Sequence, residues 1–307
     1  MTGLEISRRY YETYGRDMIK TEFPGYEGRI AAGLAGPGSD CFGFDDEISR
    51  DHDSGAGFCL WLTDEDYDKI GFSLARAYAA LPDEIDGVKK ANVPPYGKNH
   101  FGVMRISDFF MPLTGSKGAP ESNEQWLYLP DYSLAAAVNG EVFRDDLGVF
   151  TAIRNEIKTG MPQDVRLKKI AARAIGMAQS GQYNFCRCLA HGETGAAALA
   201  KAKFAEDCIS LIYLLNGSYA PFYKWALRGI KDLDEFADLS DTLGALLREK
   251  TSETQFDIIE DICAEVAGYF RKNSLSSDPG SFLEPHAYEI QAKIKDEALR
   301  NMHIMEG

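Results

Sequence analysis

Two small motifs near the start of the chain contain the side chains that are best suited to chemistry. The dipeptide Gly38-Ser39 is followed, after eleven residues, by the acidic pair Asp51 and Asp53. On a strand, side chains at i and i+2 share one face and lie roughly 6.6 Å apart along the chain. Two such carboxylates can bind one Mg²⁺, or two ions about 3.5–4 Å apart, together with phosphate oxygens. The residue types and their spacing therefore suit a site that holds a triphosphate on divalent metal.

The segments around these motifs have the patterns of strands and helices. Short apolar runs at residues 30–35, 58–62 and 101–106 are typical of core strands. Residues 5–20 repeat apolar and aromatic side chains at helical spacing. Thr63, which precedes a run of acids, is a typical helix N-cap and begins a helix that ends at about residue 81. We therefore expect the two motifs to lie between the first two strands of a sheet.

The pattern changes from about Leu134 onward, where strand-like alternation becomes rare. Apolar residues recur there at i, i+3 and i+4 in residues 149–157, 165–178, 196–215, 219–230, 239–247, 256–270 and 288–299. We predict an α+β protein of two domains. Residues 1–133 form a mixed sheet flanked by helices, and residues 134–307 form an all-α helical bundle.

Composition limits the classes of partner. The chain has 307 residues, of which 45% are apolar and 26% charged, as in ordinary globular proteins. No apolar run approaches the roughly 20 residues of a membrane span, and the N-terminus lacks an apolar signal core, so we expect a cytoplasmic protein without a membrane partner. The formal net charge of −14 argues against nucleic acid as a partner. The best basic cluster, Arg166, Lys168, Lys169 and Arg173, is better interpreted as a solvated helix face than as a nucleic-acid patch.

The six cysteines do not form the pattern of a zinc site or a disulfide framework. Cys186 and Cys188 are close in sequence, but no second close pair completes a set of ligands. We therefore expect reduced and mostly buried thiols.

The order of the motifs resembles that of a known superfamily. The DNA polymerase beta-like nucleotidyltransferases share a signature in two parts. The first part is a hydrophobic residue, then Gly, then Gly or Ser. The second part follows after nine to thirteen residues and is Asp, a hydrophobic residue, and Asp or Glu. The string GLAGPGSDCFGFDDEISRDHDSGAGFCLWL, with residues 139–145 and 219–225, resembles an uncharacterised bacterial family that has a nucleotidyltransferase-like domain. The expected layout is similar to that of aminoglycoside nucleotidyltransferases, whose helical C-terminal domain helps to bind the acceptor.

The resemblance implies roles for several residues. Gly38 and Ser39 would contact the β- and γ-phosphates, and Asp51 and Asp53 would hold Mg²⁺. His52 departs from the pattern, which has a hydrophobic residue between the two acids, and we favour a core position for it over metal ligation.

The third acid of the superfamily usually comes from a later strand, and residues 103–106 contain none. Glu141 or Asp108 could take that place, and Glu141 could serve as a metal ligand or as a general base. Lys224, which lies among aromatic residues, is either a nucleotide contact or a lysine that extends along an apolar face.

These features favour an Mg²⁺-dependent nucleotidyltransferase that moves an NMP group from an NTP to a hydroxyl acceptor and releases pyrophosphate. A small molecule is the preferred acceptor, because an acidic surface repels RNA. Two alternatives stay open, a catalytically silent nucleotide- or ligand-binding protein on the same fold and an antitoxin-like interaction module. The resemblance also suggests a homodimer.

Overall fold

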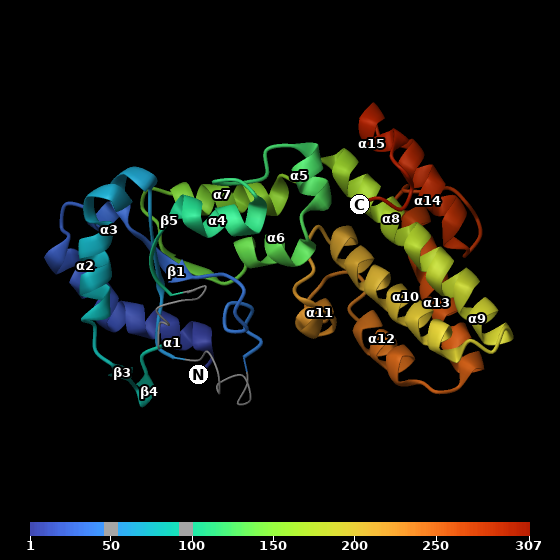
Figure 1. The fold of residues 1–307 in the computed structure, drawn as a ribbon, viewed down its shortest axis with the longest axis horizontal. Helices are drawn as coiled ribbons and strands as arrows, with labels where there is room; N and C mark the ends of the chain where they lie inside the picture. The colour runs from blue at the N-terminus through green and yellow to red at the C-terminus, as the bar shows by residue number, and fades with distance from the viewer. Residues whose placement is uncertain (46–54, 92–100) are drawn as a thin grey trace. The chain divides into compact units, whose positions relative to one another are not determined.

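The computed structural model describes residues 1–45, 55–91 and 101–307. The chain divides into two compact units. The first comprises Met1–Glu121 and Ser133–Gly160, and the second comprises Ser122–Tyr132 and Met161–Gly307. Figure 1 shows the sheet in the first unit and helices in the second. The predicted α+β class, a mixed sheet flanked by helices followed by a helical bundle, is confirmed.

A four-stranded sheet forms the centre of the first unit, in the order β5-β2-β1-β6. Its strands are β1 (Ala31–Leu34), β2 (Cys59–Leu62), β5 (Gly102–Arg105) and β6 (Glu141–Arg144). Strand β1 is antiparallel to β2 and β6, and β2 is parallel to β5, so the sheet is mixed. The predicted strands within residues 30–35, 58–62 and 101–106 are confirmed, but β6 lies in a region where we expected helices. It is short and partly exposed, so its sequence lacks the apolar run of a buried strand.

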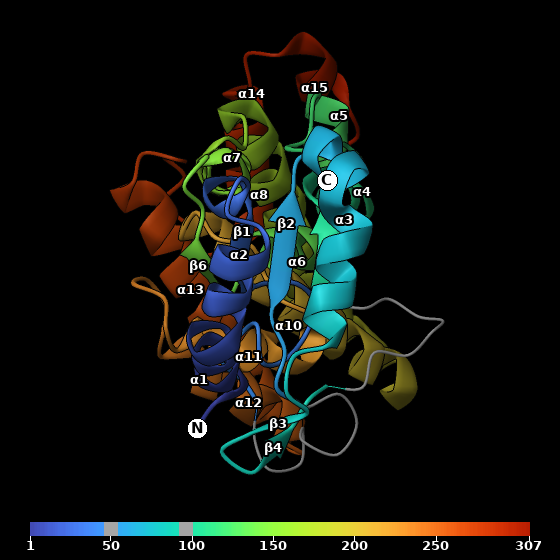
Figure 2. The ribbon, with the colours of Figure 1, turned by 90° about the vertical axis from the view of Figure 1, so that its left-hand side faces the viewer.

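One face of the sheet packs against the N-terminal helices. Leu60, Leu62 and Ala32 belong to a core that includes side chains from these helices. The helices are α1 (Gly3–Tyr10), the π-helix Tyr11–Gly15, α2 (Arg16–Glu22) and α3 (Asp64–Ala79). In Figure 2, α1, α2 and α3 lie on the side of the strands that faces the viewer. Thr63 caps α3 as predicted, because its Oγ1 accepts a hydrogen bond of 3.2 Å from the Asp66 amide.

The opposite face packs against α4 (Ile106–Thr114) and α7 (Val149–Thr159). Trp61 points to this side, since side chains alternate along β2. Its ring stacks on Phe150 with the centroids 3.9 Å apart, and Phe109 meets both rings edge to face. Helix α6 (Asp131–Val138) leads directly into β6. The sheet is therefore buried on both faces, and functional side chains must lie at its ends or edges.

The second unit is built around α8 (Gln163–Met177), which packs along α10 (Thr194–Leu215) and α14 (Leu283–Ala292). The remaining helices of this unit are α5 (Asn123–Tyr128), the π-helix Ala178–Phe185, α9 (Cys186–Ala190), α11 (Tyr223–Ile230), α12 (Leu239–Arg248), α13 (Ser252–Lys272) and α15 (Glu297–Asn301). Every window of helical periodicity after residue 134 therefore contains helix. The last window holds two helices, because the chain leaves helical geometry between α14 and α15.

The expected solvated face on α8 is wrong. Lys168 and Lys169 are 0% and 3% exposed, because neighbouring elements cover most sides of this central helix. The Lys168 Nζ donates to the His303 carbonyl at 2.7 Å, and the Lys169 Nζ lies 2.9 Å from an Asp131 oxygen. A lysine in a sequence usually indicates a solvent-exposed position. Here the packed helices bury both lysines and provide carbonyl and carboxylate oxygens as hydrogen-bond acceptors.

The thiols behave as expected. All six cysteines are free, and Cys41, Cys59, Cys208 and Cys263 are buried. Burial raises the pKa of the Cys59 thiol to about 12, so this side chain stays a neutral part of the core.

Candidate functional site

The Gly-Ser motif forms a compact turn directly after β1. Gly36 has φ of 132°, a conformation that favours glycine. The Ser39 carbonyl accepts hydrogen bonds from the amides of Phe42 and Phe44 at 3.2 and 2.9 Å. Gly38 and Ser39 are half-buried. The turn therefore presents two half-buried residues at the end of the sheet where β1 finishes.

Asn139 fixes the start of this turn from a distant part of the chain. Its Oδ1 accepts a hydrogen bond of 2.9 Å from the Gly36 amide, and its Nδ2 donates to the Gly36 carbonyl at 2.6 Å. Both polar groups of the Gly36 backbone are therefore satisfied by one side-chain amide. We refer to this pair of hydrogen bonds as the Asn139 contact.

Glu141 lies beside the turn, on edge strand β6, where its Cα pairs with that of Leu34 in β1. Its carboxylate forms a two-point ion pair with Arg8 of α1, through Nη2 to Oε1 and through Nε to Oε2 at 3.3 Å. The Arg8 guanidinium also lies 4.7 Å from the centroid of the Phe143 ring. The structure thus brings Glu141 and the Gly-Ser turn to the same end of the sheet.

Asp108, the other candidate for the third acid, lies at the opposite end of the sheet. It is in the first turn of α4, which follows the C-terminal end of β5. Because β5 runs parallel to β2 and β2 is antiparallel to β1, this end of β5 lies at the same end of the sheet as the start of β1. Asp108 is exposed and lies 3.8 Å from Arg105. The structure therefore separates Asp108 from the turn, whereas Glu141 lies beside it.

The acidic stretch after the turn, residues 40–53, is described only in part. Asp51, His52 and Asp53 lie outside the described residues, so the two expected metal ligands stay predictions. Asp45 lies at the start of the stretch, where its Oδ2 accepts a hydrogen bond of 2.7 Å from the Gly3 amide.

One carboxylate oxygen of Asp45 bears on metal binding. The Asp45 Oδ1 is buried and has no hydrogen-bond partner among the described residues. A carboxylate oxygen of this kind is a suitable ligand for a hard divalent cation. Within residues 1–45, 55–91 and 101–307, no group of three His, Cys, Asp or Glu side chains could hold a metal ion. A complete site would therefore need carboxylates from the acidic stretch.

Lys224 belongs to the second unit, in the first turn of α11. Its Nζ lies 4.3 Å from the centroid of the Trp225 ring, and Lys224 itself is exposed. The neighbouring Tyr223 is 79% exposed, and its ring lies 4.6 Å from that of Phe222. These contacts leave both earlier interpretations of Lys224 open, and its role as a nucleotide contact stays a prediction.

Three residues near the turn were not identified from the sequence. Arg8 and Asn139 contact Glu141 and Gly36, as described above. Arg154 of α7 is 4% exposed, and its Nη2 donates to the carbonyls of Val138 and Asn139 at 2.9 and 2.6 Å. Asn139 could have been found, because it begins the segment whose resemblance pointed to Glu141. Arg8 and Arg154 gave no signal, because each sits in an ordinary helical pattern.

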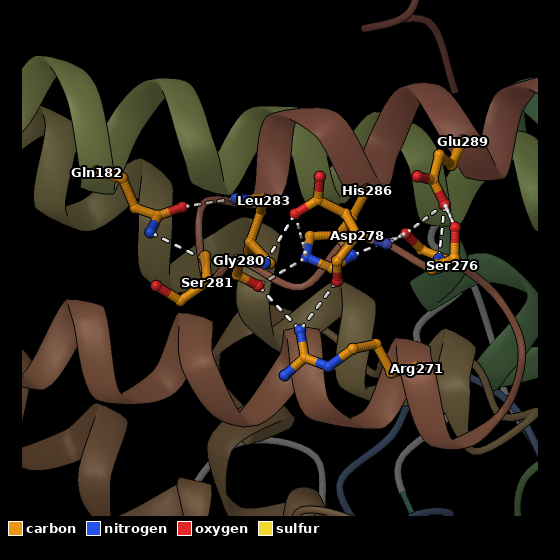
Figure 3. A network of polar contacts seen from close by, with 10 residues as sticks. Gln182, Arg271, Ser276, Asp278, Gly280, Ser281, Leu283, His286 and Glu289 are labelled. Carbon is orange, nitrogen blue, oxygen red and sulfur yellow. Dashed lines mark hydrogen bonds and ion pairs between the residues drawn. The ribbon is translucent and has the colours of Figure 1, made fainter.

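A second polar cluster, in the loop between α13 and α14, looks reactive but is structural (Figure 3). The His286 Nδ1 lies 2.9 Å from the Ser276 Oγ, which also donates to Glu289 at 2.8 Å. Arg271 donates to the carbonyls of Asp278 and Gly280 at 3.2 and 2.9 Å. Ser276 and His286 are 3% and 0% exposed, so no substrate could reach them. The cluster fixes the path of the loop.

The chain is similar to a protein family and to a solved structure. Residues 126–226 match the family described as "Domain of unknown function (DUF4037)". A solved nucleotidyltransferase-like protein from Exiguobacterium sibiricum 255-15 is similar to this chain at 12% sequence identity and a TM-score of 0.35, over 87% of this chain and 79% of that one. No curated protein matches the sequence. The family match includes Asn139, Glu141 and Arg154 but names no activity, so function must be inferred from the site.

Among the described residues, no helix has both the length and the apolar character needed to cross a membrane.

Proposed function

We propose that the first unit binds a nucleoside triphosphate with Mg²⁺ and transfers its NMP group to a hydroxyl of a small molecule, releasing pyrophosphate. One observation carries the proposal. The Gly-Ser turn after β1 and Glu141 on β6, about a hundred residues apart in sequence, meet at one end of a sheet that is otherwise covered. The acidic stretch that contains Asp51 and Asp53 follows this turn in the chain. A phosphate-binding turn beside carboxylates is the arrangement that nucleotidyl transfer needs.

Each residue then has a distinct task. Backbone amides of Gly38 and Ser39, with the Ser39 hydroxyl, contact the β- and γ-phosphates. Asp51 and Asp53 hold one or two Mg²⁺ ions, which when bound neutralise phosphate charge and lower the pKa of the acceptor hydroxyl. Glu141 takes the proton from that hydroxyl as the hydroxyl oxygen forms a new bond to the α-phosphorus. The bond from the α-phosphorus to the bridging oxygen breaks, and pyrophosphate leaves.

Charge supports a small acceptor over RNA. The chain has a net charge of −14, and its cations at Lys168, Lys169 and Arg154 are buried. An RNA acceptor would need exposed cations to displace its counterions. Lys224 lies in the second unit and is exposed, and its role as a nucleotide contact stays a prediction.

The test compares thermal stability with each NTP, with and without Mg²⁺, in the wild type and in Asp51→Asn/Asp53→Asn. A ligand at a hundredfold excess over its Kd stabilises the folded state by about 2.7 kcal/mol, which is a readily measured shift. We expect an Mg²⁺-dependent shift in the wild type that is lost in the variant, and pyrophosphate release when a suitable hydroxyl compound is added. The proposal is wrong if no NTP shifts the wild type, or if the variant keeps full activity.

A second candidate is a nucleotide-binding protein without catalysis. The ion pair favours it, because Arg8 occupies both oxygens of the Glu141 carboxylate. Arg8 takes a lone pair on each oxygen of this carboxylate, which leaves fewer positions to receive the proton of the acceptor hydroxyl. Nucleotide binding without pyrophosphate release, over a broad screen of hydroxyl compounds, would favour this candidate.

A further inference from the structure

We propose that Asn139, held in place by Arg154, positions the Gly36–Ser39 turn to receive the triphosphate. The inference rests on the proposed function, because it takes nucleotide as the ligand of that turn. Neither residue touches the reacting atoms in this scheme, so both are positioning residues.

The Asn139 contact extends the pairing of β1 with β6 beyond the last backbone pair. Leu34, the last residue of β1, pairs with Glu141 in the ladder. Two residues past the end of β1, the side-chain amide of Asn139 takes the place of a strand backbone opposite Gly36. A single side chain therefore fixes the orientation of both peptide groups next to Gly36. Gly36 has φ of 132°, a conformation that favours glycine, and the Asn139 contact pairs both of its backbone polar groups there.

Arg154 supports this contact from the other side of Asn139. Its guanidinium donates to the carbonyl of Val138, the last residue of α6, and to that of Asn139, the next residue. A cation at the C-terminal end of a helix is stabilised by the helix dipole. The Asn139 backbone is therefore held by Arg154 while its side chain holds Gly36.

The charge of Arg154 also reaches the turn itself. Burial lowers its pKa to about 10, so the side chain is still a cation at neutral pH. Arg154 is close enough to interact electrostatically with Cys41, which lies five residues after Gly36 in the same loop. The Arg154 Nη1 has no hydrogen-bond partner in the described part of the chain. Arg154 therefore adds positive potential near a turn that is proposed to bind phosphate.

The segment that follows Asn139 couples the turn to Glu141. Gly140 has φ of 64°, and a Cβ there would lie 2.0 Å from the Leu34 carbonyl oxygen. This close approach allows Asn139 to reach Gly36 while Glu141, the next residue after Gly140, pairs with β1. One short segment thus supplies both the support of the turn and the proposed base.

The experiment measures two properties of the full chain in Asn139→Ala, Arg154→Lys and the control Asn155→Ala. The first is amide hydrogen exchange in residues 36–44 without nucleotide. The second is the Kd for the Mg²⁺ complex of the NTP that stabilises the wild type most. Asn155 is the exposed neighbour of Arg154 on α7, so its variant controls for unrelated effects on that helix.

We expect Asn139→Ala to exchange faster in the turn and to bind nucleotide about tenfold more weakly, a loss of about 1.4 kcal/mol. Amide exchange outside residues 36–44 should match the wild type, whereas a general loss of structure would speed exchange throughout the chain. Arg154→Lys keeps the charge but not the two-carbonyl geometry, so it should fall between the wild type and Asn139→Ala. Asn155→Ala should match the wild type.

Two results would overturn the inference, and they are distinguishable. If the wild type binds nucleotide and Asn139→Ala binds it with the same Kd, Asn139 does not position the turn, although the proposed function stands. If the wild type binds no nucleotide with Mg²⁺, the proposed function fails and the inference fails with it. Should Arg154→Lys not fold, Asn139→Ala decides alone, because the Asn139 side chain is only partly buried.

Discussion

At the scale of single residues, the ion pair between Arg8 and Glu141 determines what chemistry the site can perform. The Arg8 and Glu141 side chains are 37% and 44% exposed, so the pair contributes less than about 1 kcal/mol to folding. Its functional effect is larger, because the same carboxylate oxygens would have to accept a proton or bind metal. Substitutions in this pair therefore test the proposed catalysis with little effect on the free energy of unfolding.

Glu141→Gln removes the proposed base but keeps the size of the side chain. We expect kcat for pyrophosphate release to fall by about 10² to 10⁴, with little change in nucleotide Kd. A kinetic assay combined with a binding titration measures both quantities. An unchanged kcat would assign Glu141 a structural role.

Arg8→Gln tests the partner of that base. We expect it to release Glu141, to change the free energy of unfolding by less than about 1 kcal/mol, and to leave kcat equal or higher. The matched control is Arg9→Gln, whose residue pairs with Asp86 at 2.7 Å and not with Glu141. If Arg8→Gln instead lowers kcat as much as Glu141→Gln does, Arg8 orients the base and does not restrain it.

At the scale of elements, edge strand β6 assembles the site, and its position depends on one close approach between backbones. The turn follows β1 and the proposed base lies on β6, so the register between these strands fixes the separation of the turn and the base. Gly140 lies against Leu34 at the end of this ladder. A side chain at Gly140 would therefore force the two strands apart.

Two glycine variants separate the effect of space from that of backbone conformation. Gly140 and Gly148 have similar φ, 64° and 71°, but a Cβ at Gly148 would meet nothing within 4 Å. Gly148→Ala should lower the free energy of unfolding by about 1–2 kcal/mol, the cost of this conformation for an L-residue. Gly140→Ala adds the clash and should cost clearly more, by about a further 1–3 kcal/mol. Urea unfolding of both variants measures the difference, and equal values would mean that β6 adjusts without strain.

At the scale of the whole molecule, the distribution of charge differs from what composition suggests. Several of the cations are used inside the protein, where Lys168, Lys169 and Arg154 hydrogen-bond to carbonyls and to Asp131. The surface therefore carries fewer cations than the count of Lys and Arg indicates, which strengthens the case against nucleic acid. Burying these charges also makes stability depend on pH.

Burial lowers the pKa of Lys168 from 10.5 to about 8. Between about pH 8 and pH 10.5 the unfolded chain therefore binds more protons at this residue than the folded protein, and the contribution of Lys168 to the free energy of unfolding rises with pH. We expect the free energy of unfolding of the wild type, relative to that of Lys168→Met, to rise by about 2 kcal/mol from pH 8 to pH 10. Urea unfolding at both values measures it. The exposed Lys272→Met is the control, and a shift of the same size there would contradict the assignment to Lys168.

The sequence by itself determined the elements that depend on local patterns. Helical periodicity located the helices after residue 134, Thr63 marked the start of α3, and apolar runs located β1, β2 and β5. It also indicated the Gly-Ser motif and Glu141, whose roles, like those of Asp51 and Asp53, stay predictions. These signals are local, because a repeat of 3.6 or 2 residues and a cap each involve only neighbouring positions.

Only the tertiary structure decided which distant residues meet. The pairing of β6 with β1, the contact of Asn139 with Gly36 and the ion pair of Arg8 with Glu141 each join segments about a hundred or more residues apart. A short, partly exposed strand has no periodicity that identifies its partner, and a lysine or arginine shows no sign in sequence of the carbonyls that will surround it. Burial and pairing are properties of the packed chain, because they depend on which surfaces the other elements cover.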